Sequence, residues 1–223
     1  MYKRQGYITE EQSLVGKPIV TSEMNLSPSA GTITQAALNG FTSSVAGGIA
    51  VLDSMFQQLR AGVLTQNLYE LPGWESSTAV SPYDSMYLWG AMVDMGVTNR
   101  PRPQYLALQL ADNAIGGATT EVQTTQSGSN PTDPQYAYGL NTVTLQTFHL
   151  LQSFAFTGSS NGSSSLVVFN VSPDYAEQVN FAGAVPSGTT VAVQQLTSVN
   201  PTDNNEAASV VSTTSSSIPS RCV

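Results

Sequence analysis

Cysteine, charge and long apolar runs are all scarce in this 223-residue sequence. The single cysteine, Cys222, excludes a disulfide within the chain, so cysteine usage does not distinguish an oxidising from a reducing compartment. Charged residues make up only 10% of the sequence, which is not the charge-rich composition of disordered proteins. No apolar run approaches the length of a membrane span. No apolar core follows the basic start at residues 1–5, so no signal peptide is visible.

Basic residues are scarce as well. Seven lysines and arginines stand against fifteen acidic residues, which gives a net charge of -8. The seven are scattered along the chain, so nothing supports contacts with nucleic-acid phosphates. The hydrophobic share is 40%, and serine, threonine, glycine, asparagine and glutamine fill most of the remainder. This composition is typical of a folded, β-rich protein with an uncharged polar surface, long enough for one large domain or two small ones.

The most informative stretch is residues 16–25, Gly-Lys-Pro-Ile-Val-Thr-Ser-Glu-Met-Asn. A short apolar run, 18–20, leads into Glu23, and a polar, turn-rich segment follows before a long helical pattern begins. This order predicts a buried strand whose carboxyl end delivers one acid to a loop. In a (β/α)8 barrel the chemistry lies at the carboxyl ends of the strands. Glu23 therefore occupies the position of a catalytic carboxylate.

A helix and a second strand are predicted next. Apolar residues recur at spacings of three, four and seven, which predicts one helix over 33–60. Ser29 or Thr32 is the expected N-terminal cap. Residues 63–71 predict a strand, and 104–115 predict a further helix.

Beyond residue 116 the pattern changes to short runs rich in β-branched residues, which glycine, proline and asparagine turns separate. The predicted strands are 119–124, 141–147, 150–157, 165–171, 178–181, 189–197 and 208–213. Short strands with regular turn signals predict an antiparallel sandwich. The expected fold is therefore α/β followed by all-β.

Residues 17–25 resemble the seventh barrel strand of the retaining glycosidases of clan A, which include arabinofuranosidases, xylosidases and heparanase-like glucuronidases. Residues 66–71 resemble the eighth strand of the same clan, and 166–171 and 196–206 resemble its carboxy-terminal sandwich. The four matches stand in the order that the family has. The resemblance implies a partial (β/α)8 barrel, strands seven and eight with their helices, followed by an antiparallel β-sandwich.

The implied domain organisation has three parts. Residues 16–116 are the carboxy-terminal part of the barrel, and 117–223 are the β-sandwich accessory domain. Residues 1–15 are a residual upstream segment or an artefact, because residues 1–5 resemble translated sequencing adapter, which is familiar in metagenomic reading frames. A whole barrel needs about 250 residues. We therefore expect a fragment of a longer enzyme, inactive when alone.

The resemblance also implies roles for individual residues. Glu23 is the nucleophile that forms a covalent glycosyl-enzyme, and Asn25, Tyr69 and Trp74 bind the sugar, whose apolar C–H faces suit aromatic rings. The general acid/base of the clan follows its fourth strand and is expected upstream. No metal or other cofactor is implied. The plainer alternatives are that Glu23 is an ordinary loop or helix-entry carboxylate and that Trp74 packs within a loop.

Other polar residues have ordinary explanations. His149 lies in an apolar stretch without a partner motif, which is typical of a core or edge histidine. Arg100 and Arg102 are expected to cap or solvate their loop rather than to grip an acidic sugar. The cluster 203–206 lacks the spacing and the glycine of a calcium loop and predicts a turn.

Two other functions compete with a glycosidase acting on an oligo- or polysaccharide. One is a non-catalytic carbohydrate-binding or surface β-sandwich protein, and the other is a structural phage or appendage protein. The strand, helix and second strand around Glu23 favour the enzyme, because a pure binding sandwich has no use for them. Enzymes of this kind act on polymers too large to enter cells, so we expect the parent protein to be secreted or periplasmic.

Overall fold

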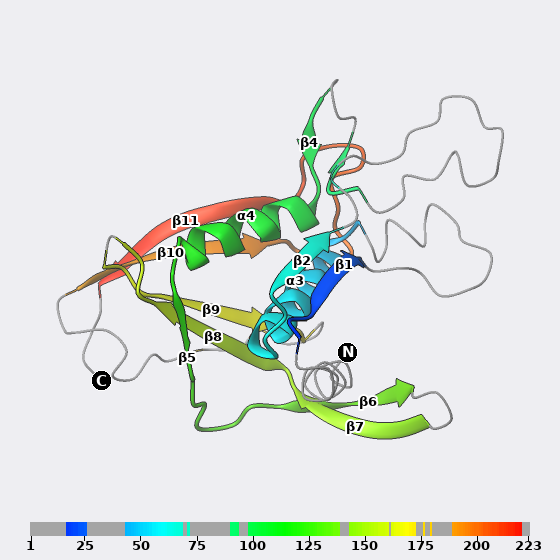
Figure 1. Ribbon diagram of the computed structural model, residues 1–223. Coiled ribbons are helices and arrows are strands. Elements are labelled where there is room, and N and C mark those ends of the chain that lie inside the picture. The colour runs from blue at the N-terminus through cyan, green and yellow to red at the C-terminus, as the bar shows by residue number, and fades with distance from the viewer. Residues whose placement is uncertain are drawn as a thin grey trace.

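A computed structural model describes residues 17–25, 43–68, 71, 90–93, 98–138, 143–160, 162–172, 176, 179 and 189–219. Its first part is a parallel strand–helix–strand unit. Strand β1 (Val20–Met24) leads to helix α3 (Val45–Arg60) and then to strand β2 (Thr65–Leu68), which pairs with β1 in parallel (Figure 1). The alternation of strand and helix around Glu23 is thus as predicted.

Helix α3 begins later than the apolar pattern predicts. Ser44 has an extended backbone, with φ -91° and ψ 172°, and its side chain accepts a hydrogen bond from the backbone N–H of Gly47. An unbroken helix over 33–60 is therefore wrong, because Ser44 is the N-cap of a helix that starts at Val45. The expected caps Ser29 and Thr32 lie outside the described residues. The predicted end at Arg60 is confirmed.

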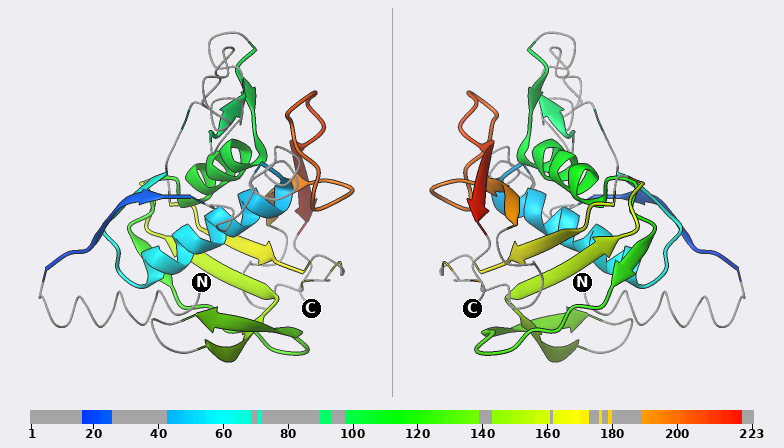
Figure 2. Two further views of the ribbon diagram at one scale, coloured as in Figure 1. Left: turned by 90° about the vertical axis from the view of Figure 1, so that its right-hand side faces the viewer. Right: turned by 90° about the vertical axis from the view of Figure 1, so that its left-hand side faces the viewer.

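Helix α3 is buried along most of its length. One face carries Phe56, whose ring meets those of Phe154, Phe156 and Phe169 edge-on, with centroids 5.1, 5.7 and 5.3 Å away. Such pairs contribute about 0.5–1.5 kcal/mol each beyond the area that they bury. The opposite face contacts β1 and β2, so α3 is a central layer of the molecule (Figure 2).

Helix α4 (Pro103–Ile115) packs across α3 and confirms the helix predicted over 104–115. A short antiparallel pair, β3 (Met92–Val93) and β4 (Arg100–Pro101), precedes it. The helix ends at Gly116, which has a left-handed backbone, φ 51°. Its buried face supplies Ala107 and Ala111 to the same core that holds Phe56.

The remaining strands are all antiparallel. Strands β5 (Thr120–Val122), β8 (Leu151–Thr157) and β9 (Ser165–Asn170) form a sheet in the order β5-β8-β9. Two further pairs are β6 (Thr132–Tyr138) with β7 (Val143–His149) and β10 (Thr190–Thr197) with β11 (Ser212–Pro219). Figures 1 and 2 show α3 lying on β8 and β9, with α4 beside α3 and also beside the β10–β11 pair.

Three predictions about the strands need correction. The strand predicted over 208–213 begins at Ser212, because the Asn205 side chain accepts hydrogen bonds from the backbone N–H groups of Val210 and Val211. Strand β6 was not predicted, since Asp133 and Pro134 are both depleted in strands. The start of the first strand is not buried: Val20 is 52% exposed.

The strand predicted over 178–181 lies almost wholly outside the described residues. In the part of the chain that the structure describes, no helix is long and apolar enough to cross a membrane.

Candidate active site

Strand β1 is irregular where it reaches Glu23. Thr21 lies opposite Gln66 and Met24 lies opposite Leu68, so three steps along β1 match two steps along β2. This is a β-bulge, in which one extra residue bends the strand and redirects the side chains around it. Bulges of this kind are common beside active sites.

The bulge decides which side chains face helix α3. The Thr21 hydroxyl donates to Gln58 Oε1 at 2.6 Å, and Gln58 Nε2 lies 3.7 Å from the Met24 sulfur. In a regular strand, residues three apart would point to opposite faces. Because both contact Gln58, the residues between them, Ser22 and Glu23, stay out of this interface and are exposed. Glu23 is therefore accessible at the carboxyl end of β1.

Asn25 follows at the end of the same strand and meets helix α4. The Gln104 side chain donates from Nε2 to Asn25 Oδ1 at 3.2 Å. Gln104 lies in the first turn of α4 and is only 2% exposed. Two of the predicted site residues, Glu23 and Asn25, thus lie two positions apart at the carboxyl end of β1, and the second is held by a buried amide from a distant helix.

The start of α4 is held by a buried ion pair. The Arg102 guanidinium donates from Nε and Nη2 to the two carboxylate oxygens of Glu206, at 2.6 and 2.9 Å. Its Nη1 donates to the carbonyl oxygen of Gly90 at 2.6 Å. Arg102 is 1% exposed, so the prediction that it caps or solvates a loop is wrong.

Residues 200–206, here called the bridging loop, connect the carboxy-terminal strands to both helices. The backbone N–H groups of Val45 and Ala46, at the start of α3, donate to carbonyls of this loop at 2.9 Å. The Asn205 amide donates to the carbonyl of Pro101, just before α4, at 2.8 Å. This tight structure agrees with the turn predicted over 203–206.

Asp203 stabilises the bridging loop from within. Its carboxylate accepts hydrogen bonds from the Ser198 hydroxyl and from the backbone N–H of Asn200. These hydrogen bonds lower the pKa of Asp203 below its ordinary value. Among the described residues, no group of three or more histidine, cysteine or acidic side chains is arranged to hold a metal ion.

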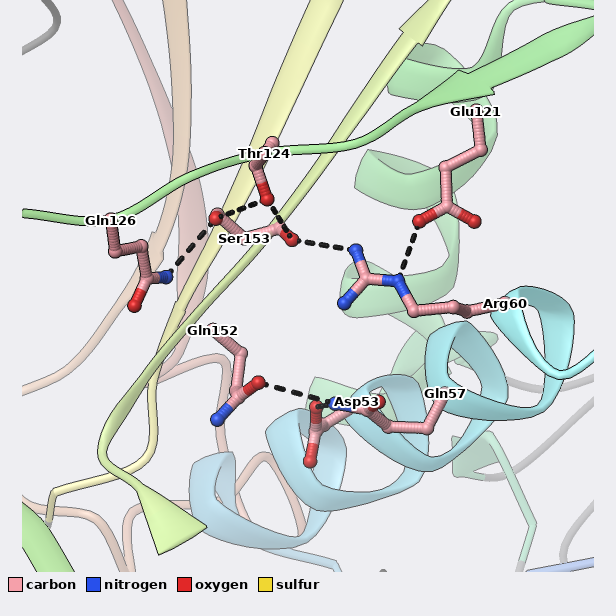
Figure 3. Close-up of polar contacts among 8 residues, drawn as sticks. All are labelled: Asp53, Gln57, Arg60, Glu121, Thr124, Gln126, Gln152 and Ser153. Atoms are coloured by element: carbon pink, nitrogen blue, oxygen red, sulfur yellow. Dashed lines mark hydrogen bonds and ion pairs between the residues drawn. The ribbon is translucent and has the colours of Figure 1, made fainter. Parts of the chain in front are cut away.

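A second polar cluster lies on the far side of α3, against β8 (Figure 3). Asp53 accepts a hydrogen bond from Gln57 Nε2 at 3.2 Å, and the same nitrogen lies 3.4 Å from Gln152 Oε1. Burial raises the pKa of Asp53, and the Gln57 hydrogen bond and the charge of Arg60 offset this in part. Gln57 faces β8 while Gln58 faces β1, so Asp53 belongs to the interface with the antiparallel sheet.

Arg60 joins the last turn of α3 to the same sheet. Its Nε is 2.7 Å from Glu121 Oε1, and its Nη2 donates to the carbonyl of Ser153 at 2.9 Å. The guanidinium carbon lies 3.9 Å from the centre of the Phe154 ring, which is a cation–π contact. Asp53, Glu121, Asp203 and Glu206 thus each have partners of their own, and none belongs to the end of β1.

Other predicted residues are placed differently or are not described. Tyr69 and Trp74 lie outside the described residues. His149 is exposed at the end of β7, where its Nδ1 lies 3.2 Å from the carbonyl oxygen of Asn130. This agrees with an ordinary edge histidine.

Gln58 and Gln104 were not singled out from the sequence. Both are buried carboxamides, and a buried carboxamide requires a partner. The local sequence carries no signal for them, because the partners, Thr21 and Asn25, lie 37 and 79 residues away.

No model of a known protein family matches the chain, and no curated protein matches it. Two solved structures are similar: the thermostable GH51 α-L-arabinofuranosidase of Thermotoga petrophila RKU-1, and the α-L-arabinofuranosidase of Thermotoga maritima in complex with arabinose. The TM-scores are 0.69 and 0.68, with 16% identity in both cases. The matches cover 99% and 97% of this chain but 44% and 43% of those proteins. The chain thus has the fold of part of these glycosidases and spans less than half of their length.

Proposed function

We propose that this chain is the carboxy-terminal part of a retaining glycosidase, which hydrolyses O-glycosidic bonds through a covalent glycosyl-enzyme. The observation that carries the proposal is the accessible Glu23 at the bulged carboxyl end of a parallel strand, within a fold shared with arabinofuranosidases. The names of those neighbours make α-L-arabinofuranosides the first substrate class to test.

In the proposed reaction the Glu23 carboxylate attacks the anomeric carbon while a second carboxylic acid protonates the departing oxygen. The same second residue then takes a proton from the water that releases the sugar. Asn25, Tyr69 and Trp74 hold the sugar ring. Retaining enzymes place their two carboxyl groups about 5–5.5 Å apart. We assign the second group to a barrel strand upstream of this chain, because Asp53, Glu121 and Glu206 engage other partners.

Exposed apolar side chains at the β1–β2 pair support the proposal that the parent enzyme has further barrel strands beside it. Parallel sheets are normally covered on both faces, and a two-stranded sheet is marginal by itself. Here α3 covers one face, while Val20 and Leu64 are 52% and 69% exposed. We propose that further barrel strands cover these side chains in the parent enzyme, which acts on saccharides outside the cell.

The decisive experiment joins this chain to its upstream coding sequence and measures hydrolysis of an aryl α-L-arabinofuranoside. Glu23→Gln should lower turnover at least about 1000-fold, because a nucleophile has no substitute in a double displacement. The matched control is Glu121→Gln, which changes a glutamate bound to Arg60 and should leave turnover near the wild-type rate.

Azide identifies the nucleophile directly. In Glu23→Gly, azide can attack the anomeric carbon in place of the carboxylate, so turnover should recover and release a glycosyl azide. A Glu23→Gln enzyme that keeps near wild-type turnover would refute the assignment. Sugar binding without turnover by the complete chain would instead favour a non-catalytic carbohydrate-binding protein.

A further inference from the structure

We propose that Gln104 is a positioning residue that orients the Asn25 carboxamide for sugar recognition. The inference rests on the proposed function, since it assigns the Glu23 end of β1 to substrate. Gln104 Nε2 donates to Asn25 Oδ1 at 3.2 Å. This hydrogen bond fixes the oxygen end of the Asn25 carboxamide, and we assign its N–H2 end to donation to a sugar hydroxyl.

Asn25 is well placed to act beside Glu23. It lies two residues further along the chain, directly after the last residue of β1. Met24 between them is buried against Gln58, which fixes the backbone from which both side chains project. A change in the direction of the Asn25 amide would therefore alter the site without moving Glu23.

Gln104 is held rigidly enough to serve this role. A Cβ atom added to Gly48 would lie 2.9 Å from the carbonyl carbon of Pro103 and 3.1 Å from the backbone nitrogen of Gln104, so α3 and α4 touch backbone to backbone here. On the other side, Arg102 is bound to Glu206. Groups that orient a functional side chain are effective when their own positions are fixed in this way.

The chemistry of residue 104 is also informative. A site 2% exposed at a helix–helix contact would normally favour leucine or methionine, since burying an amide costs about 1–3 kcal/mol unless it is hydrogen-bonded. The carboxamide of Gln104 is aimed at Asn25, the residue that directly follows β1. Its donor nitrogen selects the oxygen end of Asn25, which a hydrophobic residue could not do.

The first test uses the 223-residue chain, labelled with ¹⁵N. Gln104→Met removes the donor and keeps the volume, so the side-chain amide resonances of Asn25 should shift and their hydrogens should exchange faster. The matched control is Gln57→Met, which removes a buried glutamine amide from the β8 side of α3. Asn25 resonances that are unchanged in Gln104→Met, or changed equally in Gln57→Met, would overturn the proposal.

The second test is a double-mutant cycle in the complete enzyme. Gln104→Met and Asn25→Ala should each lower kcat/KM about 10- to 100-fold, the range that misplaced substrate contacts cost. The double variant should be no worse than Asn25→Ala, because both changes remove one function. A purely structural Gln104 would give additive losses.

The outcomes separate the two proposals. If Glu23→Gln retains turnover, the glycosidase assignment fails whatever Gln104 does. If Glu23→Gln is inactive while Gln104→Met has wild-type kcat/KM, only the positioning role fails.

Discussion

Arg102 and Glu206 are 104 residues apart in sequence and form a two-pronged ion pair at the start of α4, with N–O distances of 2.6 and 2.9 Å. Arg102 also donates to the carbonyl of Gly90. The positive charge of its guanidinium is thus balanced by Glu206, and its nitrogens Nε, Nη1 and Nη2 each have an acceptor. The pair ties the bridging loop to the helix that carries Gln104. The carboxy-terminal strands are therefore connected to the residues around the end of β1.

The first prediction concerns the loss of this pair. Glu206→Gln keeps the side-chain volume but leaves the guanidinium of Arg102, 1% exposed, without a counter-charge. Removing one partner of a buried pair costs about 3–5 kcal/mol. We expect a loss of that size in the free energy of unfolding, measured by urea denaturation of the 223-residue chain.

The matched comparison is Glu121→Gln, which removes a glutamate bound to a more exposed arginine, Arg60. The side chains of Arg60 and Glu121 are 38% and 21% exposed, and an exposed pair contributes about 0–1 kcal/mol. Equal losses in the two variants would mean that burial of Arg102 does not govern the effect.

Local signals account for the elements that the sequence predicted well. The apolar stripe over 104–115 and Gly116 after it mark a helix and its end without reference to the rest of the chain. The same holds for β8, β9 and β10, which are runs of β-branched and aromatic residues between turns. The end of α3 at Arg60 is likewise followed by Gly62, with φ 86°.

The features that prediction missed depend on distant partners. The apolar spacing runs through Ser44 unchanged. The helix starts there because Ser44 caps it, and because Ser44 pairs with Asn204 while Val45 contacts the bridging loop. The β-bulge depends on the register between β1 and β2. The position of Glu23 at the end of a strand could be predicted from the sequence, but the exposure of its side chain could not. Its catalytic role, like that of Asn25, stays a prediction.

The second prediction concerns Gly48. Alanine favours a helix over glycine by about 1 kcal/mol, so Gly48→Ala would stabilise α3 if propensity alone mattered. The added Cβ would lie 2.9 and 3.0 Å from backbone atoms of Pro103, which cannot move aside as a flexible side chain could. We expect a net loss of about 1–3 kcal/mol in urea unfolding. A gain in stability would contradict this packing.

The third prediction concerns pH. Burial raises the pKa of Asp53 above its ordinary value of 3.8, so the folded state holds this proton more tightly than the unfolded chain does. The contribution of Asp53 to stability is therefore fully present below pH 3.8 and is lost as the pH rises through the folded pKa. At neutral pH the charged, buried carboxylate of Asp53 therefore destabilises the folded protein.

Asp53→Asn removes the titrating group and keeps an oxygen that can accept from Gln57. We expect the variant to gain stability relative to the wild type as the pH rises from about 4 to 7. Urea unfolding at several pH values measures the difference. A difference that is constant with pH would show that Asp53 has the same pKa in both states.

The last prediction concerns the contact that holds β1 against α3. Gln58→Leu leaves the Thr21 hydroxyl, which donates to Gln58 Oε1 at 2.6 Å, without this acceptor in a partly buried position. Such a loss costs about 1–3 kcal/mol, whereas replacing both partners by apolar groups of similar shape can be nearly neutral. The double variant Thr21→Val/Gln58→Leu should therefore be more stable than Gln58→Leu alone. Amide hydrogen exchange should show faster opening of β1 in the single variant, with α4 unchanged, and recovery in the double variant. Additive losses would mean that the two side chains stabilise the strand independently of each other.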